Sequence, residues 1–304
     1  MTRDPLGTGT IELSPVFIRA EVRRYLDEDV GTGDATTKAL VGPNARARGR
    51  IVAREPCVVA GLEIARAVFE VLDGRVRFDA SRGDGSQADE GAILAAVEGW
   101  AAAILTGERV ALNIMQRLSG VATLTRRYVD TIAGTGATIS STRKTTPGLR
   151  LFEKYAVGVG GGRRHRVGLY DGVLVKDNHI VAAGGLEPAL RSLAGANPIV
   201  PVQVEVDSLD QLATALASGV RAFLLDNMTP GTVAEAVRLV RRSPAGAECW
   251  IEASGGITID NVRAYAETGV DTISIGALTH SSPSVDIALD LEPFPTGGDA
   301  HGDA

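Results

Sequence analysis

Cysteine is scarce in this chain of 304 residues, which contains only Cys57 and Cys249. Two cysteines cannot form the disulfide framework of a small secreted domain, so we expect a reducing compartment, the cytoplasm. Long apolar runs are also missing, and no stretch approaches the roughly 20 residues of a membrane-spanning helix. The N-terminal MTRDPLGTGTIE has no apolar core of the kind that a signal peptide needs. We therefore expect no membrane partner.

The chain also lacks an excess of basic residues and is poor in aromatic ones. Its formal net charge is −6, and aromatic residues make up 4% of it. Nucleic-acid binding requires a broad basic face, so nucleic acid is not an expected partner. With 44% hydrophobic residues, the chain is long enough to bury the core of one large domain or two.

One segment nevertheless concentrates positive charge. Between Arg143 and Arg166 the sequence holds seven Lys or Arg and one acidic residue, Glu153, which gives a local charge of +6. Three consecutive glycines, 160–162, lie within this segment. A small, strongly anionic ligand suits it better than nucleic acid, because few aromatic side chains for base stacking accompany it. The alternative is a solvated basic surface, although such surfaces rarely carry a glycine triplet followed by an apolar strand.

Six short apolar runs in the second half of the sequence each end in polar or charged residues, and helical patterns separate the last four. Apolar strands that alternate with helices are typical of a covered parallel sheet, and six or seven such units close most economically into a (β/α) barrel. Active sites of such barrels lie at the carboxyl ends of the strands, although each polar residue there could instead cap a turn or helix. The residues at these ends are Arg143 and Lys144 after ATISST, Lys176 after GVLV, Glu205 after VQV, Asp226 after AFLL, Ser254 and Gly255 after CWIEA, and Gly276 after TISI.

The first third of the chain mixes strands and helices without this rhythm. It predicts a smaller N-terminal α+β sandwich domain over residues 1–116, with about residues 1–12 loose. A long helical pattern links it to the α/β barrel, which is expected over residues 117–281. Gly120 is a candidate break in that helical pattern. We expect residues 282–304 to return to the N-terminal domain and their Gly-, Asp- and Pro-rich end to be disordered.

Two glycine turns follow the last two strands of the predicted barrel, ASGGI (253–257) and SIGALTHS (274–281). Glycines allow backbone N–H groups to face a ligand, and a following helix N-terminus adds partial positive charge, so the pair predicts a phosphate site. Glu205 and Asp226 end adjacent strands beside it. Two carboxylates beside a phosphate suit Mg²⁺, unless neighbouring Arg or Lys satisfy them.

In content and order these motifs resemble the quinolinate phosphoribosyltransferase family, also called carboxylating nicotinate-nucleotide pyrophosphorylases. The resemblance covers about residues 15–290, and the pairing of TRKTTPGLR with GGG..HR.GL.D..L.KDNH is highly specific. The matching segments are EDVGTGDATT, GERVALNIMQRLSGVAT, STRKTTPGLRLFEKYAV, GGGRRHRVGLYDGVLVKDNH, VEVD, LLDNM, EASGGI and SIGALTHS.

The resemblance implies a reaction and an assembly. The reaction is Mg²⁺-dependent transfer of phosphoribosyl from phosphoribosyl pyrophosphate to quinolinate with decarboxylation. It yields nicotinate mononucleotide, pyrophosphate and CO₂ in de novo NAD biosynthesis. The implied assembly is a homodimer or larger, in which the smaller domain of one subunit completes the barrel site of its partner.

Site residues are implied by the same motifs. The quinolinate carboxylates would be held by Arg143, Lys144, His165, Arg166 and Lys176, with Arg109 reaching in from the partner subunit. Glu205 and Asp226 would bind ribose hydroxyls and Mg²⁺, and Ser254, Gly255 and Gly276 would hold the 5′-phosphate, with Gly256 beside them in the substrate site. The implied catalytic residues are Lys144, Lys176, Glu205 and Asp226.

One position departs from the family pattern, and two other functions stay open. Arg164 stands where the family usually has Asn, so it could add a cation to the pocket or turn to solvent. A related phosphoribosyltransferase for another anionic aromatic ring would carry similar motifs. A barrel lyase that forms a Schiff base on Lys144 or Lys176 belongs to a different reaction class.

Overall fold

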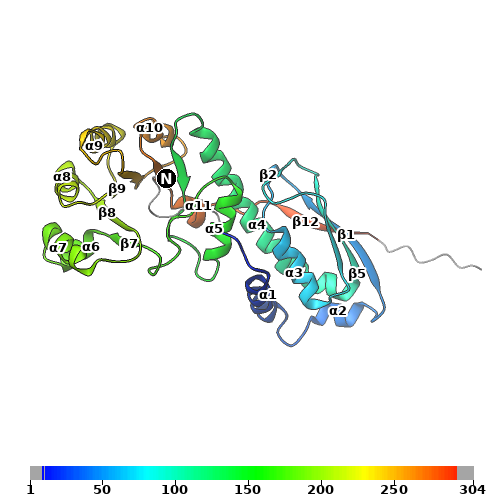
Figure 1. Cartoon of the computed structure of the whole chain (residues 1–304). Coiled ribbons are helices and arrows are strands. Elements are labelled where there is room, and N and C mark those ends of the chain that lie inside the picture. The colour runs from blue at the N-terminus through cyan, green and yellow to red at the C-terminus, as the bar shows by residue number, and fades with distance from the viewer. Residues whose placement is uncertain (1–8, 10, 293–304) are drawn as a thin grey trace, which may run out of the picture. The chain divides into compact units, whose positions relative to one another are not determined.

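The computed structural model describes residues 9 and 11–292 and divides the chain into two compact units (Figure 1). The barrel unit comprises Leu124–Ser282, and the N-terminal unit comprises Leu13–Thr123 together with the chain from Pro283 onward. The division therefore falls later than the expected boundary between residues 116 and 117. The C-terminal end that we expect to be disordered, and most of the loose start, lie outside the described residues.

The barrel unit contains one sheet of six parallel strands in the order β6-β11-β10-β9-β8-β7. All six coincide with the apolar runs of the sequence, so the predicted (β/α) barrel-type fold is confirmed. An isolated parallel bridge joins Ser140 to Arg163 at the outer edge of β6. Within residues 11–292 no ladder closes the ring between β7 and β6. The strands are β6 (Thr138–Ser140), β7 (Val173–Val175), β8 (Val202–Val206), β9 (Ala222–Asp226), β10 (Trp250–Ser254) and β11 (Thr272–Ser274).

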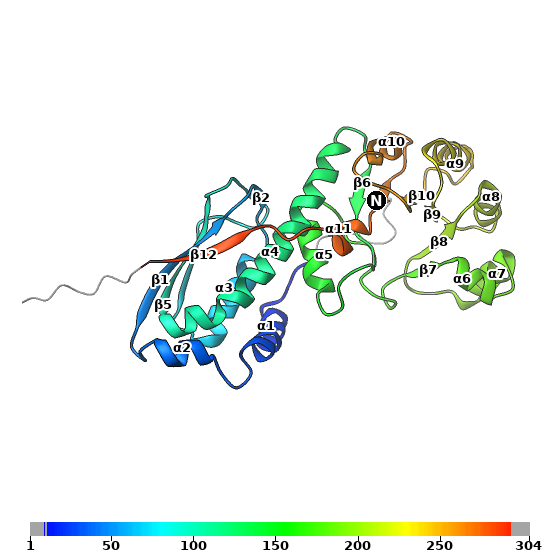
Figure 2. The ribbon, with the colours of Figure 1, turned by 180° about the vertical axis from the view of Figure 1, so that it is seen from behind.

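Helices cover the outside of this sheet, and α7, α8 and α9 lie beyond β7, β8 and β9 in both views (Figures 1 and 2). Local sequence starts them: Ser208 caps α8, and Thr229 with Pro230 begins α9. The helix that follows the ASGGI turn, α10, begins only at Val262, because residues 259–261 form a turn. The helices are α5 (Arg150–Val159), α6 (Asp177–Ala182), α7 (Leu186–Ala196), α8 (Leu209–Ala217), α9 (Pro230–Arg242), α10 (Val262–Ala266) and α11 (Ala277–His280).

The N-terminal unit is an antiparallel sheet in the order β12-β1-β5-β3, with α3 and α4 along one face. Phe69 on α3 stacks on Phe78 of β3 at 6.1 Å between ring centroids. Strand β12 pairs with β1, so the described part of residues 282–304 joins this unit. The elements are α1 (Pro15–Val30), α2 (Ala35–Leu40), β1 (Arg46–Ala53), β2 (Cys57–Val58), α3 (Leu62–Leu72), β3 (Arg77–Ala80), β4 (Gln87–Ala88), β5 (Ile93–Trp100), α4 (Ala101–Thr131) and β12 (Ile287–Glu292).

Helix α4 continues without interruption through Gly120, so the predicted break there is wrong. A Cβ atom at this position would meet the carbonyl oxygen of Pro283, on the segment that leads to β12. Gly120 therefore allows two backbone segments to approach closely and does not end the helix. None of the helices within residues 11–292 is long and apolar enough to cross a membrane.

Candidate active site

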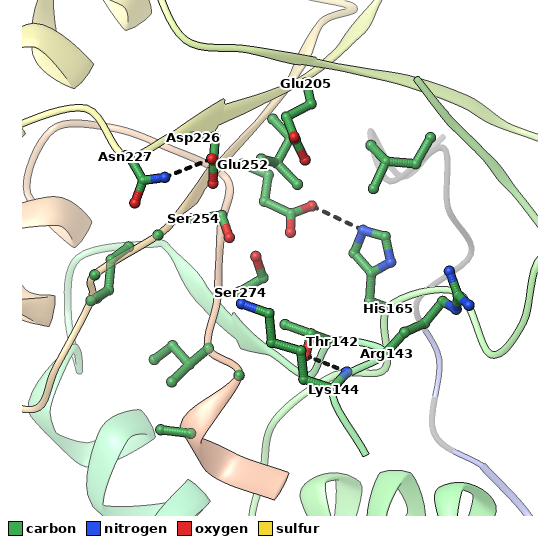
Figure 3. Close-up of a pocket in the computed structure, with 18 of the residues that line it drawn as sticks. Thr142, Arg143, Lys144, His165, Glu205, Asp226, Asn227, Glu252, Ser254 and Ser274 are labelled. Carbon is green, nitrogen blue, oxygen red and sulfur yellow. Dashed lines mark hydrogen bonds and ion pairs between the residues drawn. The ribbon is translucent and has the colours of Figure 1, made fainter. Parts of the chain in front are cut away.

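A cavity of about 650 Å³ opens at the carboxyl ends of the barrel strands (Figure 3). Its lining includes all but one of the residues that the sequence predicts for the substrate site. The exception, Arg109, lies on α4 in the N-terminal unit, with its side chain 60% exposed and its guanidinium 3.9 Å from Glu108. The predicted residues that line the cavity are Arg143, Lys144, His165, Arg166, Lys176, Glu205, Asp226, Ser254, Gly255, Gly256 and Gly276.

Two arginines give the cavity a wall of buried hydrogen-bond donors. The Nε atoms of Arg143 and Arg166 are buried and have no hydrogen-bond partner among the described residues. Arg166 Nη1 donates to the carbonyl of Gly172 at 2.9 Å, which fixes the guanidinium. Burial, and next the nearby Arg143, lower the pKa of Arg166. Unpaired buried donors cost about 1–3 kcal/mol each, so an anionic ligand would relieve a real penalty here.

Only part of the basic segment faces the cavity. Arg150 donates from Nε to Thr145 Oγ1 at 2.9 Å, and Lys154 donates from Nζ to Ser141 Oγ at 2.9 Å. Neither lines the cavity. Arg150 and Lys154 instead hold the segment in shape, while three others of the seven line the cavity. Those three are Arg143, Lys144 and Arg166.

Arg164, the departure from the family pattern, does not line the cavity. Its Nη1 lies 3.5 Å from Asp171 Oδ2, and its side chain is 27% exposed. Asp171 also accepts the backbone N–H groups of Val167 and Gly168 at 2.7 and 2.9 Å. Arg164 is therefore part of the turn that follows His165 and Arg166, and its charge is directed to Asp171.

Glu205 and Asp226 lie together at the mouth of the barrel, with Lys176 Nζ 3.5 Å from Glu205 Oε2. Burial is the main cause that raises the pKa of each carboxyl, and the two charges also oppose each other at Glu205. Lys176 lowers the pKa of both carboxyls, but burial outweighs it and both pKa values stay raised. The neighbouring lysine therefore satisfies the two carboxylates only in part. Asn227 donates from Nδ2 to Asp226 Oδ2 at 2.7 Å and adopts a left-handed conformation, with φ of 54°.

The two carboxylates fit a divalent cation, since added positive charge would offset the raised pKa of both. No group of three His, Cys, Asp or Glu suited to a metal ion occurs within the described part of the chain. Glu205 and Asp226 would therefore share the ion with oxygens from elsewhere. Mg²⁺ usually takes one or two carboxylates plus substrate phosphates, which matches a pair of this kind.

The glycine turns line the cavity beside these carboxylates. Gly255 and Gly256 have φ of +88° and +62°, and a Cβ atom at Gly255 would collide with the Asn227 side chain. A Cβ atom at Gly276 would lie 2.9 Å from the Lys144 stem and 3.0 Å from His280 Nε2. Both turns thus need glycine for space, and Gly255 needs it for its backbone conformation as well.

The sequence did not reveal a buried polar chain beneath these groups. Glu252 on β10 is fully buried, and its Oε2 accepts from Gln203 Nε2 at 2.9 Å and lies 3.5 Å from His165 Nε2. The run CWIEA reads as an apolar strand, so Glu252 passes as one polar residue within it. Its spacing of two residues from Ser254 could have revealed it, because alternate residues of a strand share a face. Figure 3 shows its carboxylate between Glu205 and Ser274, directed toward His165.

The fold and the cavity define a class: a (β/α) barrel with a cationic wall, a carboxylate pair and glycine turns at its strand ends, in one chain with an α+β unit. Residues 34–119 match the family described as "Quinolinate phosphoribosyl transferase, N-terminal domain". Residues 121–290 match "Quinolinate phosphoribosyl transferase, C-terminal domain". The chain therefore belongs to the quinolinate phosphoribosyltransferase family, and the resemblance in its sequence is confirmed.

The sequences of relatives match nearly the whole length of this chain. It is 44% identical over 271 residues to the probable nicotinate-nucleotide pyrophosphorylase (carboxylating) of Bacillus subtilis (strain 168), covering 89% of this chain and 92% of that protein. It is also 44% identical over 278 residues to the nicotinate-nucleotide pyrophosphorylase (carboxylating) of Mycobacterium leprae (strain TN), covering 90% and 96%. Among solved structures, NadC from Streptococcus pyogenes has a TM-score of 0.88 and 37% identity, covering 94% of this chain and 100% of that one.

Proposed function

We propose that this chain catalyses the carboxylating nicotinate-nucleotide pyrophosphorylase reaction. Quinolinate and phosphoribosyl pyrophosphate are converted to nicotinate mononucleotide, pyrophosphate and CO₂ in NAD biosynthesis. The observation that carries the proposal is that one cavity combines two kinds of group. Its lining includes Arg143 and Arg166, whose buried Nε donors have no hydrogen-bond partner among the described residues, and also a carboxylate pair and two glycine turns. Family membership and the names of the relatives point to the same reaction.

Quinolinate is a pyridine dicarboxylate, and the cationic wall suits it. Arg143 and Arg166 present buried N–H donors, and Lys144 adds a third cation beside them. Each charge-assisted hydrogen bond to a carboxylate contributes about 1.5–3 kcal/mol, so two carboxylates distinguish this acceptor from a monoacid. The guanidinium groups leave the pyridine nitrogen free to attack the anomeric carbon.

The opposite wall suits the phosphoribosyl donor. Glu205 and Asp226 accept ribose hydroxyls and hold Mg²⁺, and Ser254, Gly255, Gly256 and Gly276 receive the 5′-phosphate. When bound, Mg²⁺ supplies charge that offsets the departing pyrophosphate. Lys144 and Lys176 flank the carboxylates from the cationic side, where they balance charge as the glycosidic bond exchanges partners.

The same proposal includes an assembly and a location. Arg109 contributes to the acceptor site of a second subunit in a homodimer or larger oligomer, which its exposed side chain permits. Cys57 and Cys249 are free and buried, which suits a reducing cytoplasm.

The direct test is to mix the protein with quinolinate, phosphoribosyl pyrophosphate and Mg²⁺ and to follow nicotinate mononucleotide and CO₂. Product from quinolinate, with none from nicotinate or other aromatic monoacids, is the expected result. Turnover of another anionic ring in preference to quinolinate would replace the acceptor. A borohydride-trapped adduct on Lys144 or Lys176 would favour the Schiff-base lyase. Burial lowers the pKa of Lys154, but this lysine does not line the cavity.

A further inference from the structure

The imidazole of His165 is engaged at both of its nitrogens. Nδ1 lies 2.8 Å from the backbone N–H nitrogen of Arg166, which donates to it. Nε2 lies 3.2 Å from Gln203 Oε1 and 3.5 Å from Glu252 Oε2. His165, Gln203 and Glu252 are all buried, so bulk water does not replace these partners.

The direction of each hydrogen bond in this chain follows from its backbone end. The N–H of Arg166 can only donate, so Nδ1 of His165, which accepts it, carries no proton and the proton of the ring lies on Nε2. Nε2 then donates toward Gln203 Oε1, which leaves the NH₂ group of Gln203 to donate to Glu252 Oε2. Glu252 is therefore the acceptor at the buried end of the chain.

We infer that Gln203 and Glu252 are positioning residues, which hold His165 as a neutral imidazole whose Nδ1 anchors the backbone of Arg166 in the acceptor half of the site. This inference rests on the proposed function for its substrate, quinolinate. It assigns His165 a role in placing Arg166. The positive charge for the carboxylates then comes from arginine and lysine.

Protonation of His165 would work against this arrangement. A second proton would sit on Nδ1 and face the N–H of Arg166 across 2.8 Å, so two donors would oppose each other. The Arg166 backbone would have to move, and its guanidinium would move with it. A neutral imidazole keeps that bond, and with it the position of Arg166 in the lining of the cavity.

A second anchor reaches the same segment from helix α5. Lys154 Nζ donates to the carbonyl of His165 at 3.2 Å and to Ser141 Oγ at 2.9 Å. The barrel interior therefore fixes the side chain of His165, while α5 fixes its backbone. With its imidazole and carbonyl both tied, His165 is a rigid support for Arg166.

The first test examines the protein alone by two-bond ¹H–¹⁵N correlation of ¹⁵N-labelled imidazole rings at about pH 7.5. The chain has four histidines, and replacing His179, His280 and His301 in turn assigns the His165 signals by elimination. We expect a single tautomer with a protonated Nε2 and an unprotonated Nδ1. An imidazolium, or a mixture of tautomers, at His165 would overturn the inference. Because no substrate is present, this result is independent of the proposed reaction.

The second test compares Glu252→Ala with Glu252→Gln, using calorimetric binding of quinolinate and, separately, of phosphoribosyl pyrophosphate. Glu252→Gln keeps an acceptor for Gln203, whereas Glu252→Ala removes it. We expect Glu252→Ala to weaken quinolinate binding by about tenfold or more, Glu252→Gln to weaken it less, and both to leave the other substrate within about twofold. Unchanged quinolinate binding in a folded Glu252→Ala variant, or equal losses for both substrates, would contradict the positioning role. If Glu252→Ala does not fold, the quinolinate affinity of Glu252→Gln and the tautomer of His165 decide whether the positioning role holds.

Discussion

Lys154 is a buried lysine whose hydrogen-bond acceptors, Ser141 Oγ and the His165 carbonyl, are both uncharged. Burial, with a further contribution from Arg150, lowers its pKa from 10.5 to about 7. A lowered lysine pKa means that folding works against the charged form. The folded chain therefore holds the charged form only below about pH 7, and the two hydrogen bonds tie Lys154 to the segment that carries the acceptor site.

This pKa predicts a pH-dependent stability that Lys154→Met should abolish. Between the folded value of about 7 and the unfolded value near 10.5, the unfolded chain binds a proton that the folded chain has lost. The free energy of unfolding of the wild type should therefore rise by about 1.4 kcal/mol per pH unit, relative to Lys154→Met, as pH increases through this window. Urea unfolding at about pH 7.5 and about pH 9 measures the difference. Lys38→Met, at an exposed lysine, is the control, and parallel curves for wild type and Lys154→Met would refute the prediction.

Glu205 and Asp226 lead to a second prediction at the scale of single residues. We expect Glu205→Ala and Asp226→Ala each to lose most turnover while quinolinate still binds, because both carboxylates are assigned to ribose and Mg²⁺ and not to the quinolinate carboxylates. Turnover measured against Mg²⁺ concentration, with quinolinate binding measured separately, checks this. Asp207→Ala is the matched control, since Asp207 directly follows β8, the strand that carries Glu205. Asp207 is exposed and does not line the cavity. If either variant keeps near-normal turnover at saturating Mg²⁺, the role proposed for the replaced carboxylate is contradicted.

At the scale of elements, the barrel strands were readable because a covered parallel strand needs apolar residues on both faces. Runs such as AFLL and CWIEA carry that pattern, and the polar residue that follows each one marks the strand end. Parallel strands bring their carboxyl ends to one edge, so residues far apart in the sequence can be grouped from the pattern alone. This is why the sequence predicts Glu205 and Asp226 as a pair.

What the sequence could not show depends on tertiary contacts. Glu252 looks like an exception within an apolar run until Gln203 and His165 are seen beside it. Gly120 reads as a helix break, because its reason is a chain segment from the far end of the sequence. The roles of Arg150 and Arg164 were hidden for the same reason: charge alone does not distinguish a cation that faces a ligand from one that supports a loop.

Helix α4 offers a test at this scale. Alanine normally stabilises a helix interior relative to glycine by about 1 kcal/mol. At Gly120 the new methyl group would meet the carbonyl oxygen of Pro283, so Gly120→Ala should instead destabilise the protein by about 1–3 kcal/mol. Gly195→Ala is the matched control, because this glycine lies in α7 with nothing near its Cβ position. Thermal unfolding should show a lower midpoint for Gly120→Ala and an equal or higher one for Gly195→Ala. Equal midpoints for both variants would mean that the Pro283 segment yields without cost.

At the scale of the whole molecule, the cavity and Arg109 belong to different units. Every residue that lines the cavity lies in the barrel unit, whereas Arg109 lies on the part of α4 that belongs to the N-terminal unit. Family motifs assign Arg109 to the substrate. Both statements hold if the protein forms a two-fold dimer in which the N-terminal unit of each subunit contributes Arg109 to the barrel site of the other.

That arrangement predicts recovery of activity from two inactive variants. If Arg109→Ala and Lys144→Ala are each inactive, a mixed dimer carries both lesions at one site and none at the other. Random mixing makes half of the dimers mixed, each with one intact site, so about a quarter of the wild-type activity should return. Differently tagged chains, purified through both tags, establish that subunits exchange.

The control for this experiment is a mixture of Lys144→Ala with Lys176→Ala. Both lysines line the cavity of their own barrel unit, so every site in the mixed dimer keeps one lesion and no activity should return. Recovery with the Arg109 pair and none with the lysine pair requires that the two halves of one site come from different chains. If proven exchange restores nothing with the Arg109 pair, Arg109 acts within its own subunit or only in folding, and the shared site must be abandoned.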